Sequence, residues 1–159
     1  MGESWPLAFL LTWTTYGSWF HGDARGSMDR QAKGLPSDGV EPNKARAWYE
    51  RSLMASKPVL LDSRSRPIVD SAIRALCERR DWHLSALNVR TNHVHAVVAA
   101  AVDPARVLSA CKAAGTLSLV EAGSLAQDGR LWTRHGSTRW LWTEADVAAA
   151  SDYVMNQQS

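Results

Sequence analysis

Short runs of apolar, aromatic and β-branched residues recur along the chain, and each run predicts a β-strand. The predicted strands are residues 7–16, 82–89 and 92–100, followed by two shorter strands, 131–132 and 138–142, around a turn at Gly136. The first run, LAFLLTWTTY, is rich in apolar and aromatic residues, which favours a central strand. Residues 90–92 make a short connection, so the second and third strands should pair as an antiparallel hairpin.

Three further segments carry apolar residues at the 3.6-residue spacing of a helix. The first is residues 66–80. A second helix begins at Asp103 and Pro104, and its apolar face is expected to comprise Val107, Leu108, Cys111, Ala114 and Leu117. Thr143 has the position of the first residue in a capping box, which opens a last helix over residues 144–157.

The order of these elements is strand, helix, strand, strand, helix, strand, helix. It predicts an α+β protein with the ferredoxin-like, or RRM-like, arrangement: an antiparallel sheet with two helices on one face, plus a C-terminal helix. Residues 18–44 are rich in glycine and proline and predict a long irregular insertion. A short helix at 45–54 and an extended piece at 53–61 are expected to follow. With 159 residues, the chain is expected to form a single domain, 1–159.

The composition is that of an ordinary folded protein, because 45% of the residues are hydrophobic and 21% are charged. No apolar run approaches the ~20 residues that span a bilayer. The N-terminus lacks the basic-then-apolar order of a secretory signal. The two cysteines, Cys77 and Cys111, fall at apolar helical positions, so we expect them to be reduced core residues of a cytoplasmic protein.

The charge is mildly basic, with a net value of +2 and an isoelectric point near 8.7, and does not by itself indicate a nucleic-acid partner. Arginines are nevertheless concentrated in residues 64–90 and 130–139. The chain also holds eight tryptophans. Exposed tryptophans can stack on unpaired bases, although packing within a core or a sheet is their commoner role.

His93 and His95 are the first candidates for chemistry, because they lie two residues apart in the third predicted strand. Side chains at this spacing share one face of the strand, about 6.5–7 Å apart at Cα, so both imidazoles can reach one divalent metal ion. Val94, Ala96 and Val98 then face the core. The alternative is a pair of polar residues on a solvated face, and the spacing alone does not decide between the two.

Tyr153 and Gln157 lie four residues apart in the last predicted helix and therefore share one of its faces. Val147 and Val154 mark the buried stripe of this helix. Tyr153 should therefore lie at the edge of the core, with its ring supported and its hydroxyl able to reach outward. Taken alone, a tyrosine near a helix end is more often a packing residue.

Together these pieces resemble a known family. The sequence TNHVH at residues 91–95 is similar to the HUH motif (His, hydrophobic, His) of single-tyrosine transposases, which include the REP-associated tyrosine transposases. YVMNQ at residues 153–157 resembles the family's late helix, in which the nucleophilic tyrosine is followed four residues later by Gln or Asn. Residues 11–30 (LTWTTYGSWFHGDARGSMDR) resemble its N-terminal segment, so the resemblance spans nearly the whole chain.

The resemblance implies a metal-dependent, single-stranded DNA endonuclease and strand transferase that acts on DNA hairpins through a 5′-phosphotyrosine intermediate. By this resemblance, His93, His95 and Gln157 would bind one Mg²⁺ or Mn²⁺, with Asn156 as the alternative third ligand, and Tyr153 would be the nucleophile. Single-stranded or hairpin DNA is then the expected partner, which places the protein at the nucleoid. Many relatives act as homodimers, sometimes with the tyrosine helix serving the other subunit, and the sequence leaves this arrangement open.

DNA contacts are expected from the N-terminal segment and from the region before the last helix. They are Trp13, Tyr16, Trp19, Arg25, Arg134 and Arg139. For Trp13, packing within the sheet is at least as good an explanation. Two other function classes stay open: a domesticated relative that binds DNA hairpins without cutting them, and an RNA-binding ferredoxin-like module with aromatic side chains on its sheet.

Overall fold

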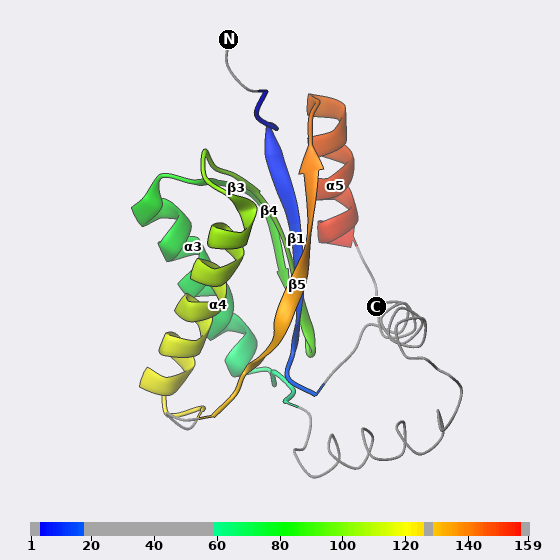
Figure 1. Cartoon of the computed structure of the whole chain (residues 1–159). Helices are drawn as coiled ribbons and strands as arrows, with labels where there is room; N and C mark the ends of the chain where they lie inside the picture. Colours follow the sequence, from blue (N-terminus) through cyan, green and yellow to red (C-terminus); the bar gives the residue numbers. More distant parts are fainter. Residues whose placement is uncertain (1–3, 18–58, 126–128, 157–159) are drawn as a thin grey trace, which may run out of the picture.

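The computed structural model describes residues 4–17, 59–125 and 129–156. In chain order its elements are β1 (Ala8–Thr15), α3 (Ser65–Arg80), β3 (His83–Val89), β4 (His93–Ala99), α4 (Pro104–Glu121), β5 (Trp132–Leu141) and α5 (Glu144–Asn156). Helices α3 and α4 lie on one side of the sheet and α5 lies on the other (Figure 1). The predicted α+β fold is therefore confirmed. In the ranges given above, no helix combines the length and the apolar character that crossing a membrane requires.

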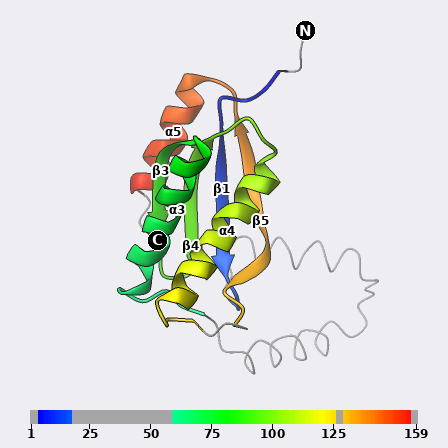
Figure 2. The same ribbon diagram turned by 90° about the vertical axis from the view of Figure 1, so that its left-hand side faces the viewer.

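The four strands form one antiparallel sheet in the order β3-β4-β1-β5. Figure 2 shows α3 and α4 packed across one face of it. β1 is central, as its apolar sequence predicts, and β3 and β4 form the expected hairpin. This strand order is the ferredoxin-like one. The predicted insertion at 18–44, the helix at 45–54 and most of the extended piece at 53–61 lie outside the described residues.

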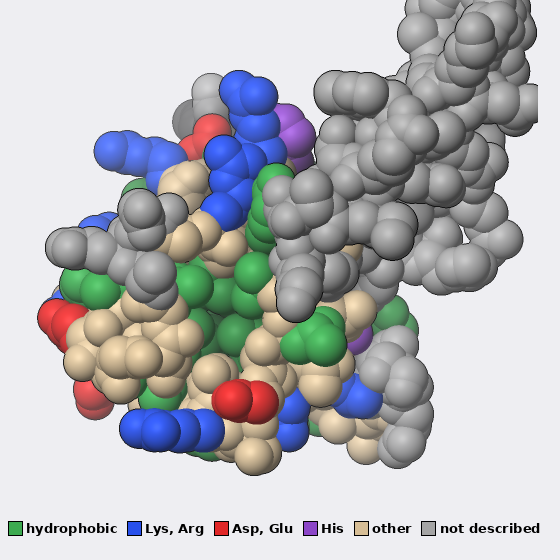
Figure 3. All heavy atoms as spheres, turned by 90° about the horizontal axis from the view of Figure 1, so that it is seen from below, with side chains coloured by type: hydrophobic (Ala, Val, Ile, Leu, Met, Phe, Trp, Pro, Cys, Tyr) green, Lys and Arg blue, Asp and Glu red, His purple; other side chains and the backbone are tan. Residues whose placement is uncertain are grey.

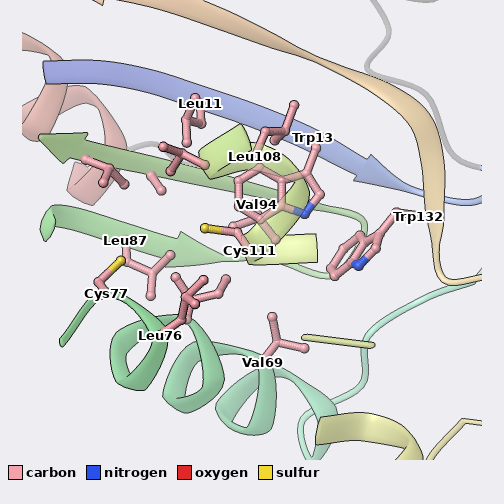
Figure 4. Close-up of a cluster of buried hydrophobic side chains, with 14 of the residues drawn as sticks. Leu11, Trp13, Val69, Leu76, Cys77, Leu87, Val94, Leu108, Cys111 and Trp132 are labelled. Carbon is pink, nitrogen blue, oxygen red and sulfur yellow. The ribbon is translucent and has the colours of Figure 1, made fainter. Parts of the chain in front are cut away.

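The face of the sheet toward α3 and α4 carries the larger hydrophobic core. Its sheet residues alternate along β1 and β4, and they are Phe9, Leu11, Trp13, Val94, Ala96 and Val98. Cys77 of α3 and Cys111 of α4 are buried there as free thiols (Figure 4). Because burial of each large apolar side chain contributes about 1.5–3 kcal/mol, this layer is the main source of the fold's stability.

The opposite face is covered by α5 through a smaller cluster. Its buried members are Ala8, Ala86, Val97, Leu141, Ala150 and Val154. Thr143 caps the helix as expected, since its Oγ1 accepts a hydrogen bond of 3.0 Å from the backbone N–H of Asp146. Ala150 and Val154 are the buried residues of α5. The helix therefore rests on the sheet through few and small side chains.

The prediction of two short strands around a turn at Gly136 is wrong. β5 is a single strand of ten residues that pairs with β1, and Gly136 lies opposite Trp13 within it. A Cβ atom at Gly136 would lie 2.7 Å from the carbonyl oxygen of Thr12 and 3.0 Å from Cδ2 of Leu108. The glycine therefore permits a close approach of β5 to its neighbours, which is the other common reason for a glycine within a strand.

Helix α4 also differs from its prediction on one face. Its buried stripe runs through Cys111, Gly115 and Leu119, whereas Leu117 is 59% exposed. Leu117 is two residues from Gly115, about 200° around the helix, and so faces away from the core.

Lys112, on the border of the stripe, links α4 to the start of β5. Its Nζ donates to the carbonyl oxygens of Thr133, Arg134 and His135 at 3.0, 3.2 and 3.3 Å.

We predict that Gly136→Val destabilises the protein by about 1–3 kcal/mol, because the added atoms must displace backbone or core side chains. Urea unfolding followed by circular dichroism measures this free energy. Ser137→Val is the matched control, because Ser137 is exposed on the same strand and should tolerate the change within about 0.5 kcal/mol. Equal stability of the two variants would show that Gly136 is not under steric constraint.

Candidate functional site

His93 and His95 lie side by side on the sheet face that α5 covers. Their ring centroids are 4.8 Å apart, and each residue is only 3% exposed. The alternative of two polar side chains on a solvated face is therefore wrong. Burying polar rings costs free energy unless their nitrogen atoms are engaged, so the buried pair is a candidate for chemistry.

The Nδ1 atom of each imidazole is held by a side-chain oxygen. Oγ1 of Thr12 lies 2.9 Å from Nδ1 of His95, and Oδ1 of Asn92 lies 2.8 Å from Nδ1 of His93. The amide oxygen of Asn92 can only accept, so His93 donates from Nδ1 and carries its lone pair on Nε2. Metal-binding histidines are commonly oriented in this way, with one ring nitrogen bonded to oxygen and the other directed to the ion.

The protonation state of His93 suits the same role. Burial, followed by the charges of His95 and Arg90, lowers the pKa of His93 from 6.5 to about 4. The ring is therefore neutral near pH 7. Neutral imidazole is the form that binds a metal ion.

Tyr153 of α5 packs against one member of this pair, His95. Its ring centroid is 5.6 Å from that of His95, with an angle of 66° between the two planes, and its side chain is 50% exposed. The ring is thus supported while half of the side chain stays accessible, as the helix pattern predicts.

A hydrogen bond fixes the end of α5 beside this contact. Asn88 of β3 lies opposite His95 in the sheet, and its Nδ2 donates to the carbonyl oxygen of Val154 at 2.9 Å. Asn88, Thr12 and Asn92 are candidate-site residues that the sequence did not predict, because strand pairing and helix docking create their contacts. The one sequence feature that could have indicated these residues is that each is a polar side chain within or beside a strand.

The predicted third ligand, Gln157, lies outside the described residues. Asn156, its alternative, donates from Nδ2 to the carbonyl oxygen of Asp152 at 2.9 Å and to its carboxylate at 2.7 Å. The described part of the chain contains no group of three or more His, Cys, Asp or Glu side chains that could hold a metal ion. His93 and His95 are therefore the two candidate ligands that the structure brings together.

Trp13 is a correction to the predicted set of DNA contacts. It is 1% exposed and packs edge-on against Trp132, with 6.0 Å between the ring centroids. Figure 4 shows both rings in the core. A side chain enclosed in this way does not reach DNA, so packing within the sheet explains Trp13.

The other predicted DNA contacts in the described ranges are at least partly accessible. Tyr16 is half-buried, and the guanidinium carbon of Arg130 lies 5.0 Å from its ring centroid. Figure 3 shows the molecule from below, where Lys and Arg side chains lie around exposed hydrophobic ones. Arg134 and Arg139 are exposed on β5. Trp19 and Arg25 lie outside the described residues.

Comparison with solved structures relates this fold to transposases. A candidate transposase from Deinococcus radiodurans R1 matches with a TM-score of 0.50 and 17% identity, over 100% of this chain and 96% of that one. A REP-associated tyrosine transposase bound to a REP hairpin matches with a TM-score of 0.48 and 12% identity, over 97% of this chain and 68% of that one. No protein-family model and no curated protein matches the chain. The similarity to the Deinococcus radiodurans structure shows only that this chain has a transposase-like fold.

We predict that His93 makes the stability of the metal-free protein depend on pH. Between pH 6.5 and about 4 the unfolded chain protonates this ring whereas the folded chain does not. The free energy of unfolding should therefore fall as the pH drops through this window, by at most about 3 kcal/mol from this group. Urea titrations with a chelator at several pH values measure the slope.

The His93→Gln variant should lose most of that slope, because its side chain does not titrate. His83→Gln, at an exposed position, is the control. If the unfolding free energy of His93→Gln depends on pH as strongly as that of the wild type, other groups cause the dependence.

Proposed function

We propose that this protein is a metal-dependent, single-stranded DNA endonuclease and strand transferase that acts like a single-tyrosine transposase. The observation that carries the proposal is the contact between the accessible Tyr153 ring and the buried His95 ring within one chain. A nucleophile and a metal-binding pair must lie together for this chemistry. The transposase-like fold supports the same conclusion.

His93 and His95 would hold a Mg²⁺ or Mn²⁺ ion, and Gln157, or Asn156 in its place, would be the third ligand. The donor set fits, because both Nδ1 atoms are held by oxygen and His93 is neutral. Both metals accept nitrogen and oxygen ligands. When bound, the ion would supply positive charge that polarises a scissile phosphate.

Tyr153 is the proposed nucleophile. A phenol is a weak nucleophile until its proton is removed. Its Oη would attack the phosphorus, so that an Oη–P bond forms while the bond from phosphorus to the 3′ oxygen breaks. The phenol loses its proton and the 3′ oxygen gains one, which leaves a 5′-phosphotyrosine and a 3′-hydroxyl. Because one phosphodiester replaces another, a second 3′-hydroxyl can later displace the tyrosine without ATP.

The proposed substrate is DNA that is single-stranded at the cleavage point and carries a hairpin nearby. An unpaired strand can bend to present one phosphate to Tyr153, whereas duplex DNA is much stiffer. Arg139 lies opposite Leu10 in the sheet, which places it on the face of the histidine pair, where its charge would suit a contact with the DNA backbone.

We predict that Tyr153→Phe abolishes covalent capture of DNA. Wild-type protein mixed with a pool of single-stranded DNA hairpins and Mn²⁺ should give an adduct that survives denaturation, because the phosphotyrosine bond is covalent. The variant lacks the attacking oxygen but keeps the ring that packs on His95, so it should form no adduct while its hairpin affinity stays unchanged. Denaturing gels and filter binding measure the two quantities.

The same experiment separates the alternatives. Hairpin retention without an adduct, even in the wild type, would favour the non-catalytic DNA-binding relative. Adduct formation by Tyr153→Phe would mean that another residue is the nucleophile. Metal-independent binding of RNA in preference to DNA would favour the RNA-binding module.

We predict that His95→Ala weakens Mn²⁺ binding at least about tenfold, since even residues that only orient metal ligands cost 10–100-fold when replaced. Isothermal titration calorimetry in the absence of DNA gives the dissociation constant. His83→Ala is the matched control at an exposed histidine. Equal Mn²⁺ affinity in the two variants would remove His95 from the site.

A further inference from the structure

The apolar contact between α5 and the sheet is too small to fix the helix precisely. Two of its thirteen residues, Ala150 and Val154, are buried, and their partners on the sheet are alanine, valine and leucine. Tyr153 and Met155 on the same helix are 50% and 56% exposed. Small side chains interdigitate little, so this packing alone resists rotation or sliding of the helix weakly.

A specific polar contact supplies the missing constraint at the end that carries the tyrosine. The Asn88 amide donates to the carbonyl oxygen of Val154, the residue that follows Tyr153. This carbonyl is in the last helical turn, where carbonyl groups have no partner within the helix. The bond therefore satisfies an otherwise unpaired group and links the helix to β3 at one defined point.

The position of Asn88 in the sheet makes this link relevant to the candidate site. Asn88 lies directly opposite His95 across the β3–β4 pair, and Tyr153 contacts that same histidine. The register of β3 against β4 therefore sets the positions of both the His95 imidazole and the Asn88 amide that is bonded to α5. The amide side chain itself contacts Val154, so it acts on Tyr153 through the helix.

We propose that Asn88 is a positioning residue that holds Tyr153 against His95 of the same chain. This inference rests on the proposed function for its effect on rate. Asn88 contributes no atom to the reaction. It fixes where the phenol oxygen stands relative to the histidine pair, and small misplacements of reacting groups are costly: about 1 Å can reduce a rate about 100-fold.

Two variants of the full chain test the role. Asn88→Ala removes the donor, and Asn88→Asp keeps the shape but places an acceptor against the Val154 carbonyl. Ser85→Ala is the matched control, at an exposed position of the same strand. Single-turnover cleavage of a captured hairpin, the hairpin dissociation constant and Mn²⁺ affinity are measured for each. Far-UV circular dichroism checks that each variant folds. If one of them does not fold, Asn88→Ser replaces it, because the serine side chain is too short to reach the Val154 carbonyl.

A second readout needs no catalysis. With 3-fluorotyrosine incorporated, the ¹⁹F resonance of Tyr153 is identified by its loss in Tyr153→Phe. Both Asn88 variants should shift or broaden this resonance, because the ring leaves its fixed place beside the His95 imidazole. Cleavage should fall about 10- to 100-fold while hairpin and Mn²⁺ affinities hold. Ser85→Ala should match the wild type throughout.

The outcomes separate this inference from the proposed function. If the wild type cleaves but the Asn88 variants cleave equally fast with an unchanged ¹⁹F resonance, the inference is overturned and the function stands. A parallel loss of rate, hairpin affinity and Mn²⁺ affinity would also overturn it, since that pattern means general destabilisation. If the wild type forms no adduct, the proposed function fails, and the ¹⁹F resonance alone decides whether Asn88 positions the tyrosine.

Discussion

The alternation of side chains along β4 is the constraint on which the rest of the structure depends. Val94, Ala96 and Val98 point into the larger core, which leaves His93 and His95 on the other face. The core fixes the register of β4 because a shift by one residue would exchange the two sets and bury the histidines among the apolar side chains. The same packing that stabilises the fold therefore also orients the imidazole pair.

Around the histidines, each neighbouring element supplies a different constraint. β1 supplies Thr12, and the connection before β4 supplies Asn92, so both Nδ1 atoms are engaged by oxygen. α5 lies on the sheet face that carries the pair and brings Tyr153 to His95. Burial by these elements keeps His93 neutral, as its lowered pKa indicates. The site is thus assembled from segments that are far apart in the sequence.

The sequence was sufficient for the features that depend on local pattern. Periodicity located the three helices and the first three strands, and spacing placed His93 with His95 on one face and Tyr153 at the edge of the core. Features that depend on distant partners could not be predicted in this way. Gly136 looked like a turn because its close neighbours, Thr12 and Leu108, become visible only when β5 pairs with β1 beside α4.

The same limit applies to Leu117 and Trp13. An apolar residue at helical spacing is not assigned to a face until the packing of α3 on α4 defines the buried stripe, and Leu117 lies outside it. A tryptophan in a central strand can face either side of the sheet, and Trp13 faces the core. For Asn88 the local signal, a polar side chain within a strand, did not identify its partner, because that partner is the backbone of Val154, 66 residues away.

The sheet separates the part of the protein that sustains folding from the part that carries the candidate chemistry. Its larger core lies on the side of α3 and α4, and the histidines and tyrosine lie on the side of the thin α5 contact. Substitutions on the α5 face therefore affect a smaller share of the folding free energy than substitutions in the larger core. In evolutionary terms, a few replacements on that face could change the candidate site in a descendant that still inherits the same fold.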